Sequence, residues 1–205
     1  TVKVMGGEDW EDWIRALRSA GVLAQGAITL AYSYIGPQLT HPMYYDGSIG
    51  AAKKHLYETA RRLTASDLDV QAYVSVNKAL VTQSSAAIPI VPLYISILYK
   101  IMKKAGTHEG CIQQMERLFR EKLFGNQGPV VDENQLIRMD DWEMREDVQS
   151  KVEELWSHVT TENLMEYADI DGYWEDFYGM FGFGIDGVDY DKDIDIEAKI
   201  PSIPE

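Results

Sequence analysis

The chain has 205 residues, of which 45% are hydrophobic, and 33 Asp and Glu against 19 Lys and Arg give a formal net charge of -14 at pH 7. This composition argues against a disordered chain, and the acidic balance argues against binding to nucleic acid or anionic lipid. The single cysteine, Cys111, excludes an internal disulfide and a multi-cysteine zinc site.

The first part of the chain alternates helical and strand-like patterns. Residues 8–20 repeat apolar side chains every three or four positions, which predicts an amphipathic helix, and residues 27–35 predict a strand that ends at Gly36. A helix is expected after Ser48, followed by a strand over residues 70–81. The apolar stripe of this helix consists of Ile49, Ala52, Leu56, Ala60 and Leu63. This alternation predicts parallel crossovers in an α/β sheet.

After Thr82 the pattern becomes mainly helical. Helices are predicted over residues 94–104, 111–124, 142–159 and 172–183. The most apolar stretch, residues 86–102, contains two prolines and is shorter than the ~20 residues needed to span a bilayer. The tail from Asp186 is acidic, and an extended end is expected at residues 200–205.

Lys53 lies at the edge of the apolar stripe, while the other basic residues of that helix lie away from it. A cation that borders a core needs a carboxylate, a route to water, or a ligand with oxygens to offer. Taken alone, the lysine favours the structural interpretation, because lysines at the edges of stripes commonly extend to water.

Tyr44 precedes Lys53 by nine residues, and on one continuous helix that separation would place the two side chains on opposite faces. Gly47 and Ser48 interrupt the segment, so a loop can fold the phenol back toward Lys53. We expect a nearby ammonium to favour the phenolate and to lower the tyrosine pKa from ~10, which suits a general acid.

Tyr32 and Tyr34 have the spacing that places two side chains on one face of a strand, near its carboxyl end. Ligands of open α/β sheets bind at such ends, so this face is a candidate border of a cleft. Ordinary amphipathic strand tyrosines are an equally weighted alternative.

The patterns do not indicate a metal site. The four histidines lack a close ligand spacing such as HExxH, and the acidic run at 189–195 lacks the Gly and Glu of a calcium loop. The string GFGIDG at 182–187 has the spacing of a dinucleotide fingerprint, but it follows a helical pattern and is interpreted as a chance match.

Several segments closely resemble the trans-2-enoyl-CoA reductases, which are relatives of the V-type bacterial enoyl-acyl-carrier-protein reductases. The matching segments are MGGEDW at 5–10, AYSYIGP at 31–37, PMYYDGSIGAAK at 42–53, KALVTQ at 78–83, GTHEGC at 106–111 and DDWE at 140–143. The signature of that family is a tyrosine and a lysine separated by eight residues, which Tyr44 and Lys53 match.

The resemblance implies an NADH-dependent oxidoreductase that reduces the 2,3 double bond of trans-2-enoyl thioesters, such as crotonyl-CoA, in fatty acid synthesis. It implies that Tyr44 is the proton donor and that Lys53 binds the nicotinamide ribose and supports the tyrosine. Tyr34 and Thr82 are then expected to contact the substrate.

By the same resemblance, Leu80, Val81 and Thr82 belong to the segment that lines the nicotinamide and the acyl entrance. Residues 1–83 are expected to form the C-terminal part of a Rossmann-like, short-chain dehydrogenase-like parallel sheet. Residues 84–205 are expected to form a mainly helical substrate-binding region and the acidic tail. Residues 88–102 of this region are expected to wall the acyl chain, and for any single one of them packing in a core helix is an equal alternative.

Members of the family are roughly twice as long as this chain, and their N-terminal half carries the Gly-rich dinucleotide fingerprint. We therefore expect an N-terminal half, as a separate chain or a missing segment, to complete the sheet and to be needed for activity. The resemblance is compatible with the bacterial cytoplasm or the mitochondrial matrix.

A second hypothesis is a non-catalytic module that binds an acyl chain or a protein and keeps Tyr44 and Lys53 as relics. A short-chain dehydrogenase that acts on alcohols is disfavoured, because those enzymes place the tyrosine and the lysine four residues apart on one helix face.

Overall fold

The computed structural model of the chain describes residues 1–88, 90–126 and 128–195. Its strands are β1 (Ala27–Ser33), β2 (Val70–Val76) and β3 (Leu136–Arg138). The first helices are α1 (Val2–Met5), α2 (Glu8–Ser19), the short 3-10 helix η1 (Gln38–Thr40), α3 (His41–Tyr44) and α4 (Ser48–Thr64). The later helices are α5 (Gln83–Ala86), α6 (Val91–Ala105), α7 (Cys111–Arg117), the π-helical segment η2 (Leu118–Leu123), α8 (Glu146–His158), α9 (Leu164–Tyr167) and α10 (Ile170–Gly179).

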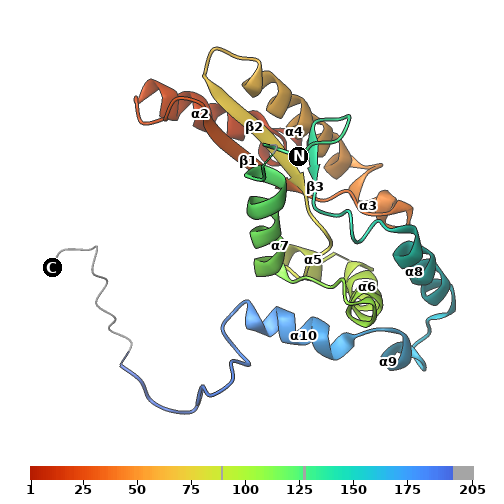
Figure 1. The fold of residues 1–205 in the computed structure, drawn as a ribbon. Helices are drawn as coiled ribbons and strands as arrows, with labels where there is room; N and C mark the ends of the chain where they lie inside the picture. The colour runs from red at the N-terminus through yellow and green to blue at the C-terminus, as the bar shows by residue number, and fades with distance from the viewer. Residues whose placement is uncertain (89, 127, 196–205) are drawn as a thin grey trace.

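The three described strands form one parallel sheet in the order β1-β2-β3. β1 pairs with β2 along its whole length, from Ala27 opposite Val70 to Ser33 opposite Val76, while β3 pairs with the end of β2. Parallel neighbours need a crossover, and α3 and α4 lie on the crossover between β1 and β2 (Figure 1). The predicted α/β class is therefore confirmed.

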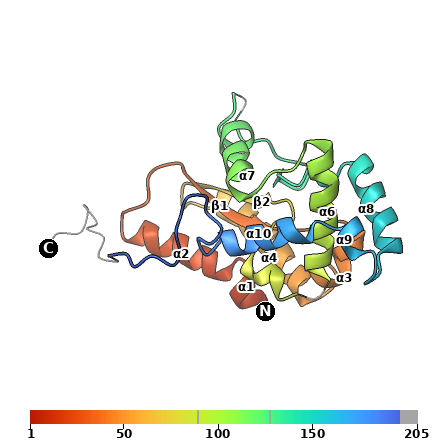
Figure 2. The same cartoon turned by 90° about the horizontal axis from the view of Figure 1, so that it is seen from below.

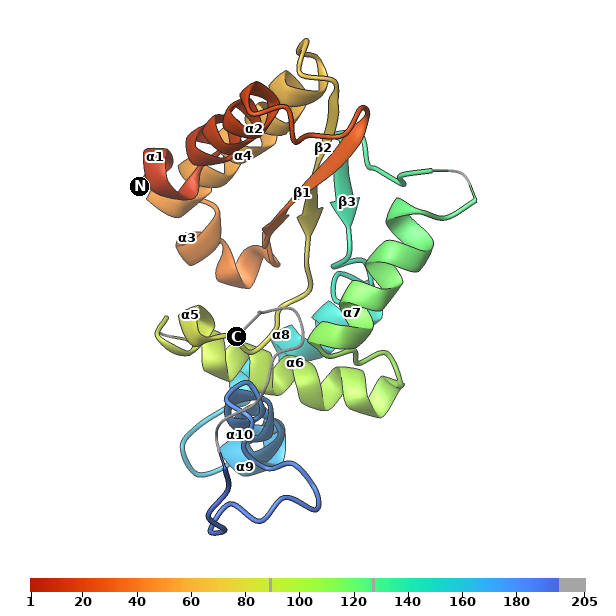
Figure 3. The same cartoon turned by 90° about the vertical axis from the view of Figure 1, so that its left-hand side faces the viewer.

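Helices cover the sheet and its carboxyl edge. Figure 3 shows α2 and α4 on one side of the sheet and α7 on the other, with α6, α8, α9 and α10 gathered beyond the strand ends. Figure 3 shows the strand arrows pointing toward α5 and α6, and Figure 2, which views that end, shows α6 and α10 lying across it. The carboxyl ends of the strands therefore face a helical layer.

The core of the α/β part lies between α4 and β2. Four members of the predicted stripe of α4 are at most 8% exposed, namely Ala52, Leu56, Ala60 and Leu63. Leu56, Ala60 and Leu63 belong to one cluster with Val70, Ala72, Val74 and Val76 of β2. The alternation in Val70–Val76 and the helical period in Ser48–Thr64 thus bury matching faces against each other.

A second core surrounds α6. Ile97, Leu98, Tyr99 and Met102 have no exposed surface, and they cluster with Val148 and Val152 of α8 and Tyr173 of α10. Because α6 is covered by α8 and α10, the apolar stretch that contains it has few polar side chains. In the described part of the chain, no helix has the length and apolarity that crossing a membrane would require.

The predicted strand over 70–81 ends early, at Val76. β1 and β3 end at the same level, because their last residues, Ser33 and Arg138, both pair with Val76. Without a neighbouring strand, residues 77–82 run on without ladder pairing and enter the helical layer. This irregular segment brings the residues after β2 to the carboxyl edge of the sheet.

The helical predictions hold in outline and differ at their ends. Residues 111–124 divide into α7 and η2, and α8 begins at Glu146 because residues 141–144 form a turn. α10 begins at Ile170, where the Asp169 side chain accepts a hydrogen bond from Gly172 N. The sequence patterns did not indicate β3, and the extended end expected at 200–205 lies outside the described residues.

Candidate active site

A cavity of about 350 Å³ lies at the carboxyl edge of the sheet. Residues at the end of β1 and after β1 and β2 line one side of it, and residues of α1 and of the segment from α3 to α6 line the rest. The lining includes Tyr32, Tyr34, Tyr44, Lys53, Lys78, Leu80 and Thr82. Parallel strands present their C-terminal ends together at one edge, so residues distant in sequence meet there.

Tyr44 and Lys53 meet in this cavity because they belong to different helices. Tyr44 is the last residue of α3, and Lys53 lies in the second turn of α4. The Lys53 ammonium lies 4.7 Å from the centre of the Tyr44 ring and 5.5 Å from that of Tyr34, and it donates a hydrogen bond to the Tyr34 carbonyl oxygen. The prediction that Tyr44 lies outside the helix of Lys53 is confirmed.

The expectation that the Tyr44 pKa is lowered is wrong. Burial raises the pKa of the Tyr44 phenol, because removal from water disfavours the phenolate. Burial likewise lowers the pKa of Lys53 from 10.5 to about 8. The raised pKa keeps Tyr44 protonated at neutral pH, and the Lys53 ammonium lies over the face of its ring.

Tyr32 and Tyr34 both border the cavity, as their spacing predicted. Tyr32 is 54% exposed. Tyr34 lies just beyond the last residue of β1, and its ring packs edge-on against Tyr44 with the centroids 4.9 Å apart. Its hydroxyl donates a hydrogen bond of 3.0 Å to Glu143 Oε1. Burial raises the pKa of the Tyr34 phenol, and the negative charge of Glu143 raises it further.

Glu143 belongs to the matching segment DDWE at 140–143, and the structure places it at the centre of a buried network. Its side chain has no exposed surface. Oε1 accepts from the hydroxyls of Tyr34 and Tyr94, at 3.0 and 2.6 Å, and Oε2 accepts from Ala79 N at 2.7 Å. No local pattern could have indicated this role, because Tyr34 and Glu143 are 109 positions apart.

Lys78 is a second residue that sequence reasoning missed. It lines the cavity although the residue is only 2% exposed, and its ammonium donates to Ala79 O at 2.9 Å. The ammonium also lies 4.7 Å from the centre of the Tyr99 ring. Burial lowers the pKa of Lys78 to about 8, against the opposing attraction of Glu143. The available signal was a lysine within the apolar stretch predicted as a strand over residues 70–81.

The three residues predicted to line the cofactor take different positions. Leu80 and Thr82 line the cavity. The Val81 side chain is 7% exposed in the core around α6, and its N–H donates to the Tyr99 hydroxyl. The Thr82 hydroxyl accepts from Ser85 N in a capping box that starts α5, which leaves its own hydrogen available to a ligand.

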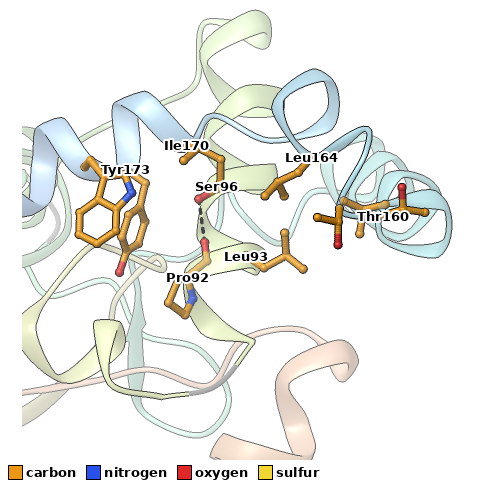
Figure 4. Close-up of a pocket in the computed structure, with 10 residues that line it drawn as sticks. Pro92, Leu93, Ser96, Thr160, Leu164, Ile170 and Tyr173 are labelled. Carbon is orange, nitrogen blue, oxygen red and sulfur yellow. Dashed lines mark hydrogen bonds between the residues drawn. The ribbon is translucent and has the colours of Figure 1, made fainter.

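The segment predicted to wall the acyl chain divides between two cavities. Ile88, Val91 and Ile95 line the cavity that holds Tyr44. The other side of α6 faces a second cavity of about 520 Å³ (Figure 4), to which Pro92, Leu93, Ser96, Leu164 and Ile170 contribute. In Figure 4 the Ser96 hydroxyl is engaged by the Pro92 carbonyl. Among the described residues, the lining of this cavity contains no carboxylate, amine or imidazole, whereas Lys53 and Lys78 line the first cavity.

A parallel α/β sheet with a tyrosine and a lysine at its carboxyl edge is the arrangement of the short-chain dehydrogenase-like class. Residues 1–124 match the family model described as "Trans-2-enoyl-CoA reductase catalytic region", and residues 131–194 match "Enoyl reductase FAD binding domain". The chain belongs to the trans-2-enoyl-CoA reductase family, and the resemblance inferred from its sequence is confirmed.

Relatives and solved structures agree with this family. The chain is 59% identical over 203 residues to "Trans-2-enoyl-CoA reductase" of Euglena gracilis, covering 98% of this chain and 38% of that protein. It is 57% identical over 206 residues to "Enoyl-[acyl-carrier-protein] reductase [NADH]" of Coxiella burnetii (strain Dugway 5J108-111), covering 99% of this chain and 51% of that protein.

The structure is similar to that of the Treponema denticola trans-2-enoyl-CoA reductase in complex with NAD, with a TM-score of 0.90 and 51% identity over 95% of this chain and 49% of that one. The Clostridium acetobutulicum enzyme in complex with NAD gives the same TM-score at 47% identity, over 95% of this chain and 51% of that one. The chain thus spans about half the length of these proteins, or less.

The second family model has a flavin in its name. Backbone N–H groups of a Gly-rich turn after a strand, or basic side chains, hold a dinucleotide pyrophosphate. Within the described part of residues 131–194, β3 is followed by Asp140 and Asp141, and both carboxylate oxygens of Asp140 already accept from Arg138. These residues do not fit a pyrophosphate, and "FAD binding" is a family label here.

Proposed function

We propose that this chain is the C-terminal half of an NADH-dependent trans-2-enoyl-CoA reductase, which reduces the 2,3 double bond of thioesters such as crotonyl-CoA to acyl-CoA in fatty acid synthesis. The observation that carries the proposal is the convergence of Tyr44, Lys53 and Tyr34 in one cavity at the carboxyl edge of a parallel sheet. The names of the related proteins support the same reaction.

In this proposal Tyr44 is the proton donor. NADH supplies a hydride to the β-carbon of the substrate, and negative charge then develops on the thioester oxygen. A phenol in the cavity stabilises that charge by a hydrogen bond and supplies the proton to the α-carbon. The raised pKa of Tyr44 keeps the phenol protonated before the reaction, when a proton donor is needed.

Lys53 is proposed to bind the nicotinamide ribose and to hold Tyr44. Its ammonium uses one donor on the Tyr34 carbonyl and faces the Tyr44 ring. Among the described residues it forms no ion pair with a carboxylate, so an ammonium with three donors keeps donors for the hydroxyl oxygens of a ligand. In this proposal, the hydroxyl groups of the ribose explain why the half-buried Lys53 lies at the edge of an apolar stripe.

The remaining assignments follow the lining of the cavity. We assign Leu80, Val81 and Thr82 to the nicotinamide, with the Thr82 hydroxyl also near the thioester, and Tyr34 to the substrate. Val81 acts in this assignment through its backbone position, since its side chain is buried. The division into a sheet part at 1–83 and a helical substrate-binding part at 84–205 stays a prediction.

The proposal requires an N-terminal half. The nicotinamide end of NADH fits the groups of the cavity, but in the part of the chain that the structure describes no strand leads through a Gly-rich turn into a helix. We propose that the N-terminal half, as a separate chain or an adjoining segment, supplies the pyrophosphate site.

The exposed edge of β1 supports this partner. In the described sheet, β1 pairs with β2 alone, so its other edge offers unpaired N–H and C=O groups. Figure 1 places α2 beside β1, on the side away from β3. In α2, Ile14 of the predicted stripe is buried, but Trp13 is 62% and Leu17 36% exposed. An added strand and its helix would cover both features.

The test is NADH consumption with crotonyl-CoA by this chain alone, by the chain with its N-terminal half, and by the Tyr44→Phe form of that pair. We expect turnover only in the pair, and a loss of about 100-fold or more in the Tyr44→Phe pair with NADH affinity retained. Tyr45→Phe is the matched control, because Lys54 faces the Tyr45 ring at 4.9 Å outside the cavity lining.

Unchanged turnover in the Tyr44→Phe pair would reject Tyr44 as the donor. A folded pair without any turnover would instead favour the non-catalytic module that binds an acyl chain or a protein.

The compartment follows the family resemblance, and we place the reaction in the bacterial cytoplasm or the mitochondrial matrix. The related proteins come from bacteria and from Euglena.

A further inference from the structure

We propose that Glu143 is a positioning residue of the reductase site, which fixes the hydroxyl of Tyr34 and, through Tyr34, the placement of Tyr44 and Lys53. This inference rests on the proposed function. It assigns a role to the region after β3, which matches a different family model from the region that holds the tyrosine and the lysine.

Glu143 joins the three segments that build the cavity wall. Tyr34 follows β1, Ala79 follows β2, and Tyr94 lies in α6, and all three donate to its carboxylate at 2.6 to 3.0 Å. Gln149 of α8 supports the arrangement, because its amide donates to the Glu143 carbonyl oxygen at 2.7 Å and to the Tyr94 hydroxyl at 3.3 Å. The carboxylate is therefore held from several directions.

The burial of this charge needs a reason. A carboxylate without exposed surface is costly unless donors and a counter-charge compensate. Three donors surround Glu143, and the positive charge of Lys78 favours its ionised form against the burial that raises its pKa. A neutral apolar residue could join the same segments at lower cost, but it could not orient two phenol hydroxyl groups.

The effect on the reactive pair passes through Tyr34. Because its hydroxyl hydrogen points to Glu143, the ring is held at its far end, and the ring edge packs against Tyr44. The carbonyl of the same residue accepts from the Lys53 ammonium. One residue thus contacts both members of the reactive pair, and Glu143 determines where that residue lies.

This arrangement also separates the roles of the two phenols. The Tyr34 hydroxyl has a single hydrogen, and the carboxylate of Glu143 engages it. In this state Tyr34 offers lone pairs to the cavity but no donor, while the Tyr44 hydroxyl keeps its hydrogen for the substrate. Tyr44 is therefore the donor, while Tyr34 borders the substrate in the cavity and orients Tyr44.

The test compares Glu143→Gln, Tyr34→Phe and the double variant in the pair of this chain with its N-terminal half. Because misplacement of a reacting group by about 1 Å costs on the order of 100-fold in rate, we expect Glu143→Gln to lower kcat by about 10- to 100-fold. The KM for crotonyl-CoA and the Kd for NADH should stay within about twofold. In the Tyr34→Phe background, Glu143→Gln should lower kcat by less than about threefold further.

Glu109→Gln is the control for the loss of a buried carboxylate. Glu109 is 4% exposed and accepts two hydrogen bonds from Arg117, at 2.6 and 2.8 Å, outside the cavity lining. Its replacement should lower the melting temperature and leave kcat per folded protein unchanged. If Glu143→Gln does not fold, Glu143→Asp, which keeps the charge and withdraws the carboxylate, is judged by the same criteria.

The outcomes separate the role of Glu143 from the reaction itself. An active wild-type pair with unchanged kcat in the folded Glu143 variant would refute the role of Glu143 alone. Independent, multiplicative losses in the double variant would also refute it, since Glu143 would not act through Tyr34. A folded wild-type pair without turnover would refute the proposed function, and the positioning role with it.

Discussion

Replacement of Lys78 by methionine should change how the stability of the protein depends on pH. Lys78 is 2% exposed, and burial lowers the pKa of its ammonium from 10.5 to about 8. Methionine fills a similar volume without a charge, and its side chain can pack on the Tyr99 ring that the ammonium now faces at 4.7 Å. The substitution therefore removes one buried titratable group while it retains most of the packing.

The magnitude follows from the pKa. Each unit of pKa corresponds to about 1.4 kcal/mol, so the charged Lys78 costs the folded state about 3 kcal/mol. Because the folded-state pKa lies below the unfolded-state value, the unfolded chain binds the proton more tightly. The cost is fully present below pH 8, and the free energy of unfolding of the wild-type protein rises as the pH increases from about 8 to 10.5.

Urea unfolding of the protein with its N-terminal half, at fixed concentration, measures this difference between pH 7 and 10.5. The difference in unfolding free energy, Lys78→Met minus wild type, should decrease by about 3 kcal/mol between pH 7 and pH 10.5. Lys53 contributes to both proteins and cancels. Lys104→Met, at an exposed position of α6, controls for the loss of one positive charge from an acidic chain. A difference between variant and wild type that stays constant with pH would refute the reasoning.

Two further predictions concern the rate. Turnover should fall as the pH rises through about 8, because burial lowers the pKa of Lys53 to about 8 and the neutral amine has one donor fewer. A profile of rate against pH checks this prediction. The control variant Lys54→Met should show the same decline as the wild type. Gly36→Ala should lower kcat by about tenfold or more, since Gly36 has φ of +74° and an added Cβ would collide with the hydroxyls of Thr40 and Tyr34. A Gly36→Ala enzyme with wild-type kcat would show that the position of Tyr34 does not matter.

The sequence was sufficient for features that depend on local periodicity. The stripe of α4 could be assigned because a helix repeats every 3.6 residues, and Ala52, Leu56 and Leu63 are buried as predicted. The break before Ser48 placed Tyr44 outside that helix for a similar local reason. The Tyr44 and Lys53 pair was therefore accessible from spacing together with the family resemblance.

Features that depend on burial were not accessible in this way. The pKa of Tyr44 is raised rather than lowered, because burial removes the phenol from water, and the extent of burial follows from the packing of α3 and α6. Lys78 appears in the sequence as an ordinary polar residue after a strand. Only the tertiary structure shows that its amine is enclosed.

The sequence by itself determined the helix and strand patterns and the parallel α/β class, because each follows from residues close together in the chain, and with the family resemblance it predicts Tyr44 and Lys53 as the reactive pair. The tertiary structure decided the end of β2, the three-residue strand β3 and the network of Glu143. These features arise where segments far apart in sequence exchange hydrogen bonds, as between Tyr34 and Glu143. The burial of such groups depends on every segment that covers them, and no local pattern records that.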